Sequence, residues 1–267
     1  IDRSPVQAGL IALALLGAIA LLAPTGCGKA DLPDAPTRAA SELTEAPPAA
    51  PKADSEVQVG GNTRIESFRK AKPHVMAIYR DHRETFYCGC RFSDDKVIDL
   101  ESCGYRVRKN EKRARRMEVE HVVPAEAFGQ SFLAWREGHP DCVTKKGKAF
   151  KGRRCAKKVS QLFRRMEADI HNLQPSIGEV NGDRSNYSME EIPGEAREYG
   201  ACDVEIDGRK IEPKPSIRGD IARIYFYMDK AYPNRGIVGD KRRRILTAWD
   251  AQDPIDDWER TRAKRIA

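Results

Sequence analysis

The run 116–124 places two carboxylates and an imidazole at the end of a predicted strand. Apolar residues alternate there with Glu118 and Glu120, so an extended chain would put both carboxylates on one face. His121 follows directly, and Pro124 is suited to the first turn of a helix. A strand that passes straight into a helix fixes its side chains closely, so this run predicts a rigid platform for acid–base or metal chemistry.

The N-terminal region predicts an exported protein. Residues 9–23 form an uncharged apolar run, which is short for a membrane span of about 20 residues but typical of a signal peptide. We expect that peptide to cover residues 1–26 and the mature protein to be periplasmic or secreted. Cys27 follows Thr-Gly, as in a lipidated protein, but Pro24 stands where such signals usually have Leu. A lipid anchor at Cys27 is therefore left open.

The composition changes sharply along the chain. Residues 27–62 are rich in Pro, Ala and acidic side chains and have almost no large apolar ones, so they cannot bury enough surface to offset chain entropy. They predict a disordered linker. Residues 63–267 fit one domain by length, because about 100 to 200 residues per domain is usual. We find no internal repeat.

Six cysteines remain in that domain, and an even number in an exported chain indicates disulfides. Six thiols allow fifteen pairings, so the connectivity stays open, although a Cys142–Cys155 pair would close the basic loop between them. A zinc site is the alternative, but the spacing lacks the paired cysteines that structural zinc prefers. The disulfide candidates are Cys88, Cys90, Cys103, Cys142, Cys155 and Cys202.

Positive charge is concentrated around the motif. The chain carries a net charge of +7, yet residues 106–165 alone hold 18 Lys or Arg against 6 Asp or Glu. Such a segment would attract a polyanion; the alternative is a merely solvated surface or one that touches anionic lipid. Because the charge brackets a carboxylate–imidazole cluster, we favour nucleic acid. The substrate-binding candidates are Arg113, Arg115, Arg116, Lys151 and Lys157.

The periodicity predicts more helix than strand. A capping box at Thr63–Glu66 predicts a helix that continues to about residue 79, and short strands are expected between residues 86 and 107. A second capping box, Ser176–Glu179, predicts a helix that carries Asn181. Further helical patterns cover 159–169 and three segments after residue 217.

Three blocks in order, residues 117–124, 165–186 and 218–228, resemble the endonuclease I family. These bacterial nucleases are secreted or periplasmic and cut DNA, and often RNA, with little sequence preference. The resemblance implies an α+β fold: a mainly helical single domain around a ββα-metal (His-Me finger) core with a small antiparallel sheet. It also implies a divalent metal, 5′-phosphorylated products, and a monomer without a protein partner.

By this resemblance, His121 is the general base, and Glu120 and Asn181 are the protein ligands of Mg²⁺. Glu118 and Glu167 support and orient the catalytic site. The chemistry agrees, because Mg²⁺ prefers oxygen ligands and keeps several waters, and neutral imidazole accepts a proton near neutral pH.

The resemblance also implies an arginine beside the phosphate, from the loop that precedes a cysteine. Arg153 and Arg154 both fit, since the loop 141–158 is longer here than in the shorter members of the family. His171 and Asn172 remain an alternative ligand pair. The competing function is a non-catalytic nucleic-acid-binding envelope protein, which would keep the basic surface without turnover.

Overall fold

The computed structural model describes residues 60–194 and 196–267, all of which belong to one compact unit. The predicted signal peptide, Cys27 and most of the predicted linker lie outside the described residues. No helix within the described residues is long and apolar enough to cross a membrane. Asn62 already contacts the folded part, because its backbone N–H donates to the Tyr232 hydroxyl at 2.8 Å.

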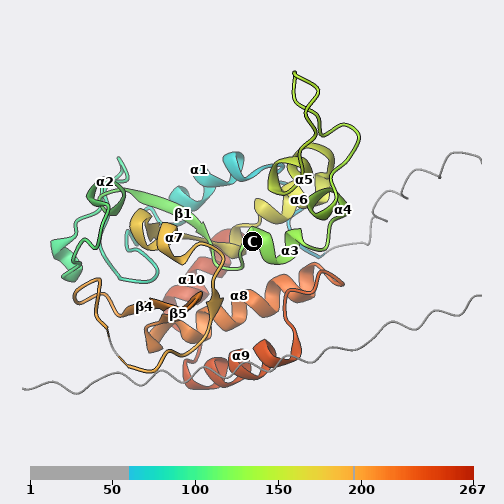
Figure 1. The fold of residues 1–267 in the computed structure, drawn as a ribbon. Coiled ribbons are helices and arrows are strands. Elements are labelled where there is room, and N and C mark those ends of the chain that lie inside the picture. The colour runs from blue at the N-terminus through green and yellow to red at the C-terminus, as the bar shows by residue number, and fades with distance from the viewer. Residues whose placement is uncertain (1–59, 195) are drawn as a thin grey trace, which may run out of the picture. The chain divides into compact units, whose positions relative to one another are not determined.

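The motif run forms strand β1 (Met117–His121), which pairs antiparallel with β2 (Leu173–Ile177). Helix α7 (Gly178–Arg184) follows β2 without a break. Two antiparallel strands and a helix therefore lie together, although more than 50 residues separate the strands in the chain (Figure 1).

The segment between β1 and β2 is helical. It forms the lobe that carries α4 and α5 in Figure 1. Its elements are α3 (Ala125–Gly129), α4 (Leu133–Arg136), α5 (Arg153–Val159), α6 (Gln161–Glu167) and the 3₁₀ helix η2 (Ile170–Asn172).

The N-terminal part of the described chain precedes β1. It consists of α1 (Phe68–Ile78), the 3₁₀ helix η1 (Glu101–Cys103) and α2 (Glu111–Ala114). The strands predicted between residues 86 and 107 are reduced to isolated bridges, such as Phe92 opposite Ile98.

The C-terminal part adds a second small sheet and three helices. The sheet has the order β3 (Ser188–Met189), β5 (Lys210–Pro213) and β4 (Val204–Asp207), and its β3–β5 pair is parallel while its β4–β5 pair is antiparallel. The small antiparallel sheet that was expected is the β1–β2 pair. The helical elements are η3 (Pro215–Ile217), α8 (Arg218–Ala231), α9 (Asp240–Gln252) and α10 (Asp257–Ile266).

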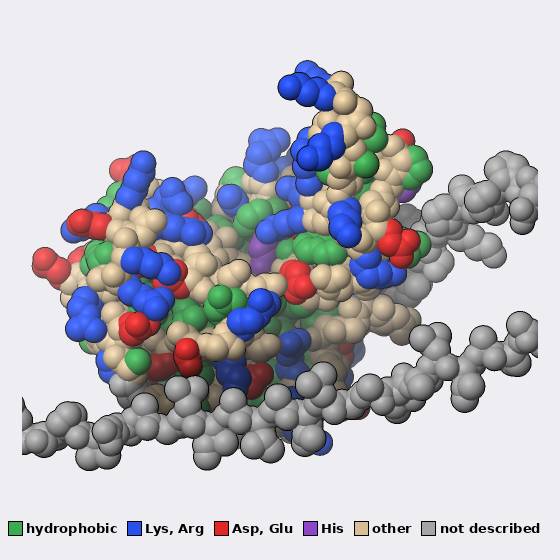
Figure 2. Space-filling model, in the orientation of Figure 1, with side chains coloured by type: hydrophobic (Ala, Val, Ile, Leu, Met, Phe, Trp, Pro, Cys, Tyr) green, Lys and Arg blue, Asp and Glu red, His purple; other side chains and the backbone are tan. Residues whose placement is uncertain are grey.

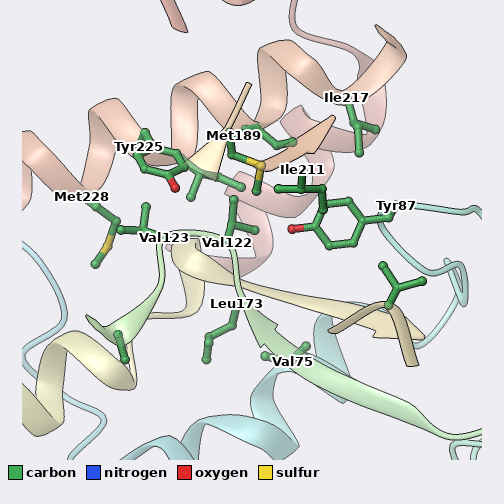
Figure 3. Close-up of a cluster of buried hydrophobic side chains, with 14 of the residues drawn as sticks. Val75, Tyr87, Val122, Val123, Leu173, Met189, Ile211, Ile217, Tyr225 and Met228 are labelled. Atoms are coloured by element: carbon green, nitrogen blue, oxygen red, sulfur yellow. The ribbon is translucent and has the colours of Figure 1, made fainter. Parts of the chain in front are cut away.

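The core lies between the β1–β2 pair and α8. Figure 3 shows Val122, which directly follows β1, on the side of Ile211 of β5 and Tyr225 of α8, and Leu173 of β2 on the opposite side of the strands, toward α1. All four side chains are nearly inaccessible to solvent. Burying each large apolar side chain contributes about 1.5–3 kcal/mol, so this contact holds the C-terminal helices against the strands that carry the motif. The architecture is the expected mixture of many helices with small sheets.

All six cysteines of the domain are paired, so the zinc alternative is wrong. The predicted Cys142–Cys155 disulfide is confirmed. The others join Cys88 to Cys202 and Cys90 to Cys103. The Cys88–Cys202 bond spans 114 residues and links the segment before the motif to the C-terminal part.

Both predicted helices form, and the second carries Asn181 as predicted, but neither begins with the predicted capping box. Helix α1 begins only at Phe68, because the Asn62 side chain accepts from the N–H groups of Arg64 and Ile65 and holds that stretch in a turn. Ser176 is buried in β2, and the Glu179 side chain turns away to accept from other backbone N–H groups, such as that of Lys109 at 2.7 Å. At Glu179 a long-range partner thus replaced the local one.

Candidate active site

Two adjoining hollows lie where β1 meets α7 and α5. Their volumes are about 500 and 340 Å³, and His121, Arg153 and Asn181 line both. The first also contains Glu118 and Glu120. Figure 2 shows Lys and Arg side chains on the two lobes that flank this region, around α2 and around α4 and α5. A larger hollow of about 710 Å³ beside α1 and α10 contains none of these five residues.

His121 ends β1 and is almost fully buried. Its Nε2 lies 2.8 Å from the backbone carbonyl oxygen of Glu167, and its ring lies against that of Phe68 at 4.4 Å. A carbonyl oxygen can only accept, so Nε2 carries the proton and Nδ1 carries the lone pair. Burial, and then the positive charge of Arg153, lower the pKa of His121 to about 3. The imidazole is therefore neutral at physiological pH and able to accept a proton at Nδ1.

Glu120 forms a buried ion pair. Its Oε1 lies 3.2 Å from Nη1 of Arg184 and accepts from the Tyr87 hydroxyl at 3.0 Å. Burial raises the pKa of Glu120, although Arg184 and Tyr87 both act to lower it. Its second oxygen, Oε2, is buried without a hydrogen-bond partner among the described residues. An unpaired buried carboxylate oxygen is costly, so Oε2 is an atom that could bind a cation.

Glu118 holds the other side of the first hollow. It accepts from the Arg113 guanidinium, which reaches it across Gly182, and from Arg116. Burial acts to raise the pKa of Glu118, but these two arginines outweigh it and bring the pKa below its usual value. The Asn181 Nδ2 donates to Glu118 at 2.7 Å. This bond orients the Asn181 amide and leaves its Oδ1 oxygen for another partner.

Arg153 begins α5 and reaches into both hollows. Its Nε donates to Oε1 of the fully buried Glu167 at 2.5 Å, and Lys157 lies 3.9 Å from the other oxygen. The two terminal nitrogens of Arg153 have no ion pair within the described chain. Arg154 lies elsewhere, with its guanidinium 4.1 Å from the Phe150 ring. The structure thus brings Arg153 to His121 and leaves Arg154 outside.

The sequence model of the family described as Endonuclease I matches residues 62–267. The chain belongs to the endonuclease I family. Among its relatives, a periplasmic deoxyribonuclease of Aeromonas hydrophila is 43% identical over 208 residues, 75% of this chain and 81% of that protein. An extracellular deoxyribonuclease of Aeromonas hydrophila is 43% identical over 209 residues, 76% of this chain and 84% of that protein. An endonuclease-1 of Buchnera aphidicola subsp. Acyrthosiphon pisum is 39% identical over 208 residues, 76% of each chain.

In this endonuclease I chain, the alternative ligand pair His171 and Asn172 lies outside the two adjoining hollows. His171 stacks on Tyr227 at 4.1 Å and contacts Asp169. The amide of Asn172 is buried against the backbone of Val123. Both side chains of the alternative ligand pair are thus occupied in holding η2 to its neighbours.

The predicted substrate-binding residues are spread over both lobes. Arg113 and Arg116 hold Glu118, and Arg115 pairs with Glu111 on the surface of α2. Lys157 lies near Glu167, whereas Lys151 lines a separate hollow beside His139. Basic side chains therefore border the site on two sides.

Two residues that support this endonuclease I site escaped the sequence analysis. Arg184, the last residue of α7, is buried, and its Nη1 donates to the carbonyl oxygen of His121 at 2.8 Å as well as pairing with Glu120. Tyr87 is also buried and donates to Glu120. Neither residue gave a signal in the sequence, because Tyr87 lies 33 residues from Glu120 and Arg184 lies 63 residues from His121.

Proposed function

We propose that this protein is a metal-dependent endonuclease that hydrolyses phosphodiester bonds of DNA with little sequence preference and leaves 5′-phosphorylated products. Its family, the deoxyribonucleases among its relatives and the chemistry of the hollow support this function. We further propose that β1, β2 and α7 form the ββα-metal (His-Me finger) core, since β1 carries the base and one acidic ligand while α7 carries the amide ligand.

The oxygens around the hollow fit Mg²⁺. Oε2 of Glu120 is buried without a hydrogen-bond partner within the described residues. Asn181 donates from Nδ2 to Glu118, so its Oδ1 oxygen remains available as a ligand. One carboxylate and one amide oxygen suit a hard cation that keeps several waters. A bound divalent ion would also offset the cost of ionising Glu120, because it would be the largest local charge. When bound, Mg²⁺ supplies Lewis-acid stabilisation of the charge that develops at the phosphate and the leaving oxygen.

The side chains supply the rest of the chemistry. His121 takes a proton from water at Nδ1, while the Glu167 carbonyl keeps the other nitrogen protonated. The water oxygen then attacks phosphorus, the bond to the 3′ oxygen breaks, and that oxygen takes a proton from solvent water to become a 3′ hydroxyl. A pKa of about 3 makes His121 a weak base in the free protein. The negative charge of a bound phosphate would offset that of Arg153 and raise this pKa toward the working range.

Glu167 links the base to the phosphate-binding group. Its backbone carbonyl holds His121, and its side chain holds Arg153. The Arg153 guanidinium is therefore held in place through its Nε. Its two terminal nitrogens have no ion pair in the described part of the chain, so they can donate to two oxygens of one phosphate. The single observation that carries this mechanism is the Nε2 contact of His121, because it leaves the lone pair on Nδ1.

Cleavage of supercoiled plasmid tests the function. We expect nicking in Mg²⁺, none in EDTA, and losses of at least 100-fold for His121→Ala and Glu120→Ala, as is usual for removing a general base or a metal ligand. His74→Ala is the matched control, since His74 is exposed on α1 outside the hollow. Folded wild-type protein that binds plasmid but leaves it intact in several divalent metals would establish the binding-protein alternative. The same assay on RNA decides whether RNA is also cut.

We also propose that the protein is exported and acts in the periplasm or outside the cell as a monomer. Three disulfides support this location, because such bonds persist in oxidising compartments. Mass spectrometry of protein from fractionated cells would locate it and would show whether Cys27 carries lipid.

A further inference from the structure

A hairpin closed by the Cys142–Cys155 disulfide, called the basic arm here, projects from the lobe that carries α4 and α5 (Figure 1). Both cysteines are fully buried. The hairpin is held by a bond from the Phe150 N–H to the Cys142 carbonyl at 2.8 Å and turns at Gly147, whose φ of 76° favours glycine. The arm is therefore a structured projection with a covalent base.

The positive charge at the tip of the arm has no acidic partner within the described residues. Between its two cysteines lie four lysines and two arginines, and no acidic residue. Lys145, Lys146 and Lys148 are exposed at the tip, beside the turn at Gly147, and none of them has an acidic partner in the described part of the chain. By contrast, Arg115 on the facing lobe pairs with Glu111 at 2.9 Å. The tip lysines are thus available to an external anion.

The arm leads directly into the catalytic site. Gly152 joins it to Arg153, which lines both hollows. Arg153 lies five positions after Lys148, so the chain between them spans at most about 17 Å. A DNA strand advances about 3.4 Å per nucleotide, so this reach corresponds to roughly five base pairs.

We propose that the basic arm is a second substrate-binding element that holds the phosphate backbone of duplex DNA within about five base pairs of the bond to be cut. The proposal rests on the proposed function, because it assumes that DNA occupies the hollow. An anionic membrane is the other polyanion that an exported protein meets. The tip is less suited to it, since no aromatic or large aliphatic side chain lies between Thr144 and Ala149.

The test compares wild-type protein with the triple variant Lys145→Gln, Lys146→Gln, Lys148→Gln. The control is Lys230→Gln, Arg244→Gln, Lys264→Gln, which removes the same charge from exposed positions on α8, α9 and α10. Binding to a labelled 40-base-pair duplex is measured by fluorescence anisotropy in EDTA from 50 to 200 mM salt. The KM for the same duplex is measured in Mg²⁺, beside that for a DNA hairpin with a six-base-pair stem.

Each phosphate that is neutralised contributes about 0.9 to the slope of log K against log salt. If all three lysines bind phosphates, the magnitude of this slope is smaller by about 2.7 in the arm variant than in wild type. The ratio of wild-type affinity to variant affinity should then fall by roughly 40-fold between 50 and 200 mM salt. The KM should rise for the 40-base-pair duplex far more than for the hairpin. The control variant should keep the wild-type slope.

Equal slopes for the arm variant and wild type would overturn the proposal. So would a variant that keeps its duplex affinity but loses binding to phosphatidylglycerol vesicles, since that result would assign the arm to a membrane. A wild-type protein that binds duplex in EDTA but never cuts it would refute the proposed function alone, because the salt slopes would still report on the arm.

Discussion

Replacing Arg184 with Met tests the buried ion pair that holds the motif strand. The side chains of Arg184 and Glu120 are 2% and 1% exposed, so the substitution leaves Glu120 buried without its cation. Removing one partner of such a pair costs about 3–5 kcal/mol. For a domain of this size, the Tm should fall by about 6–20 °C.

The loss should depend on pH. Burial already raises the pKa of Glu120, and without Arg184 it should rise further. A carboxyl group whose pKa is higher in the folded state is least harmful below its unfolded pKa of about 4.3 and destabilises increasingly as the pH rises. In EDTA, the free-energy cost of Arg184→Met should therefore be larger at pH 8 than at pH 5. Adding Glu120→Gln should recover a large part of it, because no buried charge then remains.

Urea unfolding at the two pH values provides the measurement. Arg115→Met is the matched control: the Arg115–Glu111 pair is 57% and 66% exposed, so its loss should cost less than about 1 kcal/mol. A cost of Arg184→Met that is equal at both pH values, together with additive effects of the two buried substitutions, would refute the reasoning.

Three further predictions concern the rest of the domain. In Gly182→Ala the new Cβ would meet only the flexible end of the Arg113 side chain, at 2.1 Å. Stability should stay within about 1 kcal/mol, while cleavage slows roughly tenfold, as when other groups that orient a metal ligand are lost. In Gly178→Ala the new Cβ would meet a backbone oxygen at 2.6 Å, and the substitution should cost about 1–3 kcal/mol of stability. Thermal unfolding and plasmid cleavage separate the two variants, and an equally destabilised pair would contradict this account. Burial and neighbouring acids raise the pKa of Asp220 to about 8, so Asp220→Asn should stabilise the protein by on the order of 2–4 kcal/mol more at pH 8 than at pH 5 in urea unfolding; a gain independent of pH would count against it. Replacing Cys142 and Cys155 by Ser should lower the free energy of unfolding by about 3 kcal/mol for a loop of this length, and an unchanged value would show that the arm contributes nothing to stability.

Much of the site could be predicted because it depends on local geometry. Alternation along residues 117–121 places Glu118 and Glu120 on one face of a strand, and in the structure both contact side chains of α7. The Cys142–Cys155 loop was predicted for the same reason, since short separation makes pairing geometrically easy. The positions of Arg153 and Arg154 could not be separated, because which of two neighbouring guanidinium groups faces the hollow depends on how α5 packs.

The sequence by itself determined the motif strand, the excess of helix, the basic charge around the motif and the family. Only the tertiary structure decided which groups meet across long separations: Glu179 with the N–H of Lys109, Glu120 with Arg184, and His121 with the Glu167 carbonyl. The periodicity of a strand or helix repeats every few residues and is visible in the sequence. Partners that lie 46 to 70 residues apart are selected when buried polar groups must be satisfied in the folded chain, and the sequence pattern does not contain that choice.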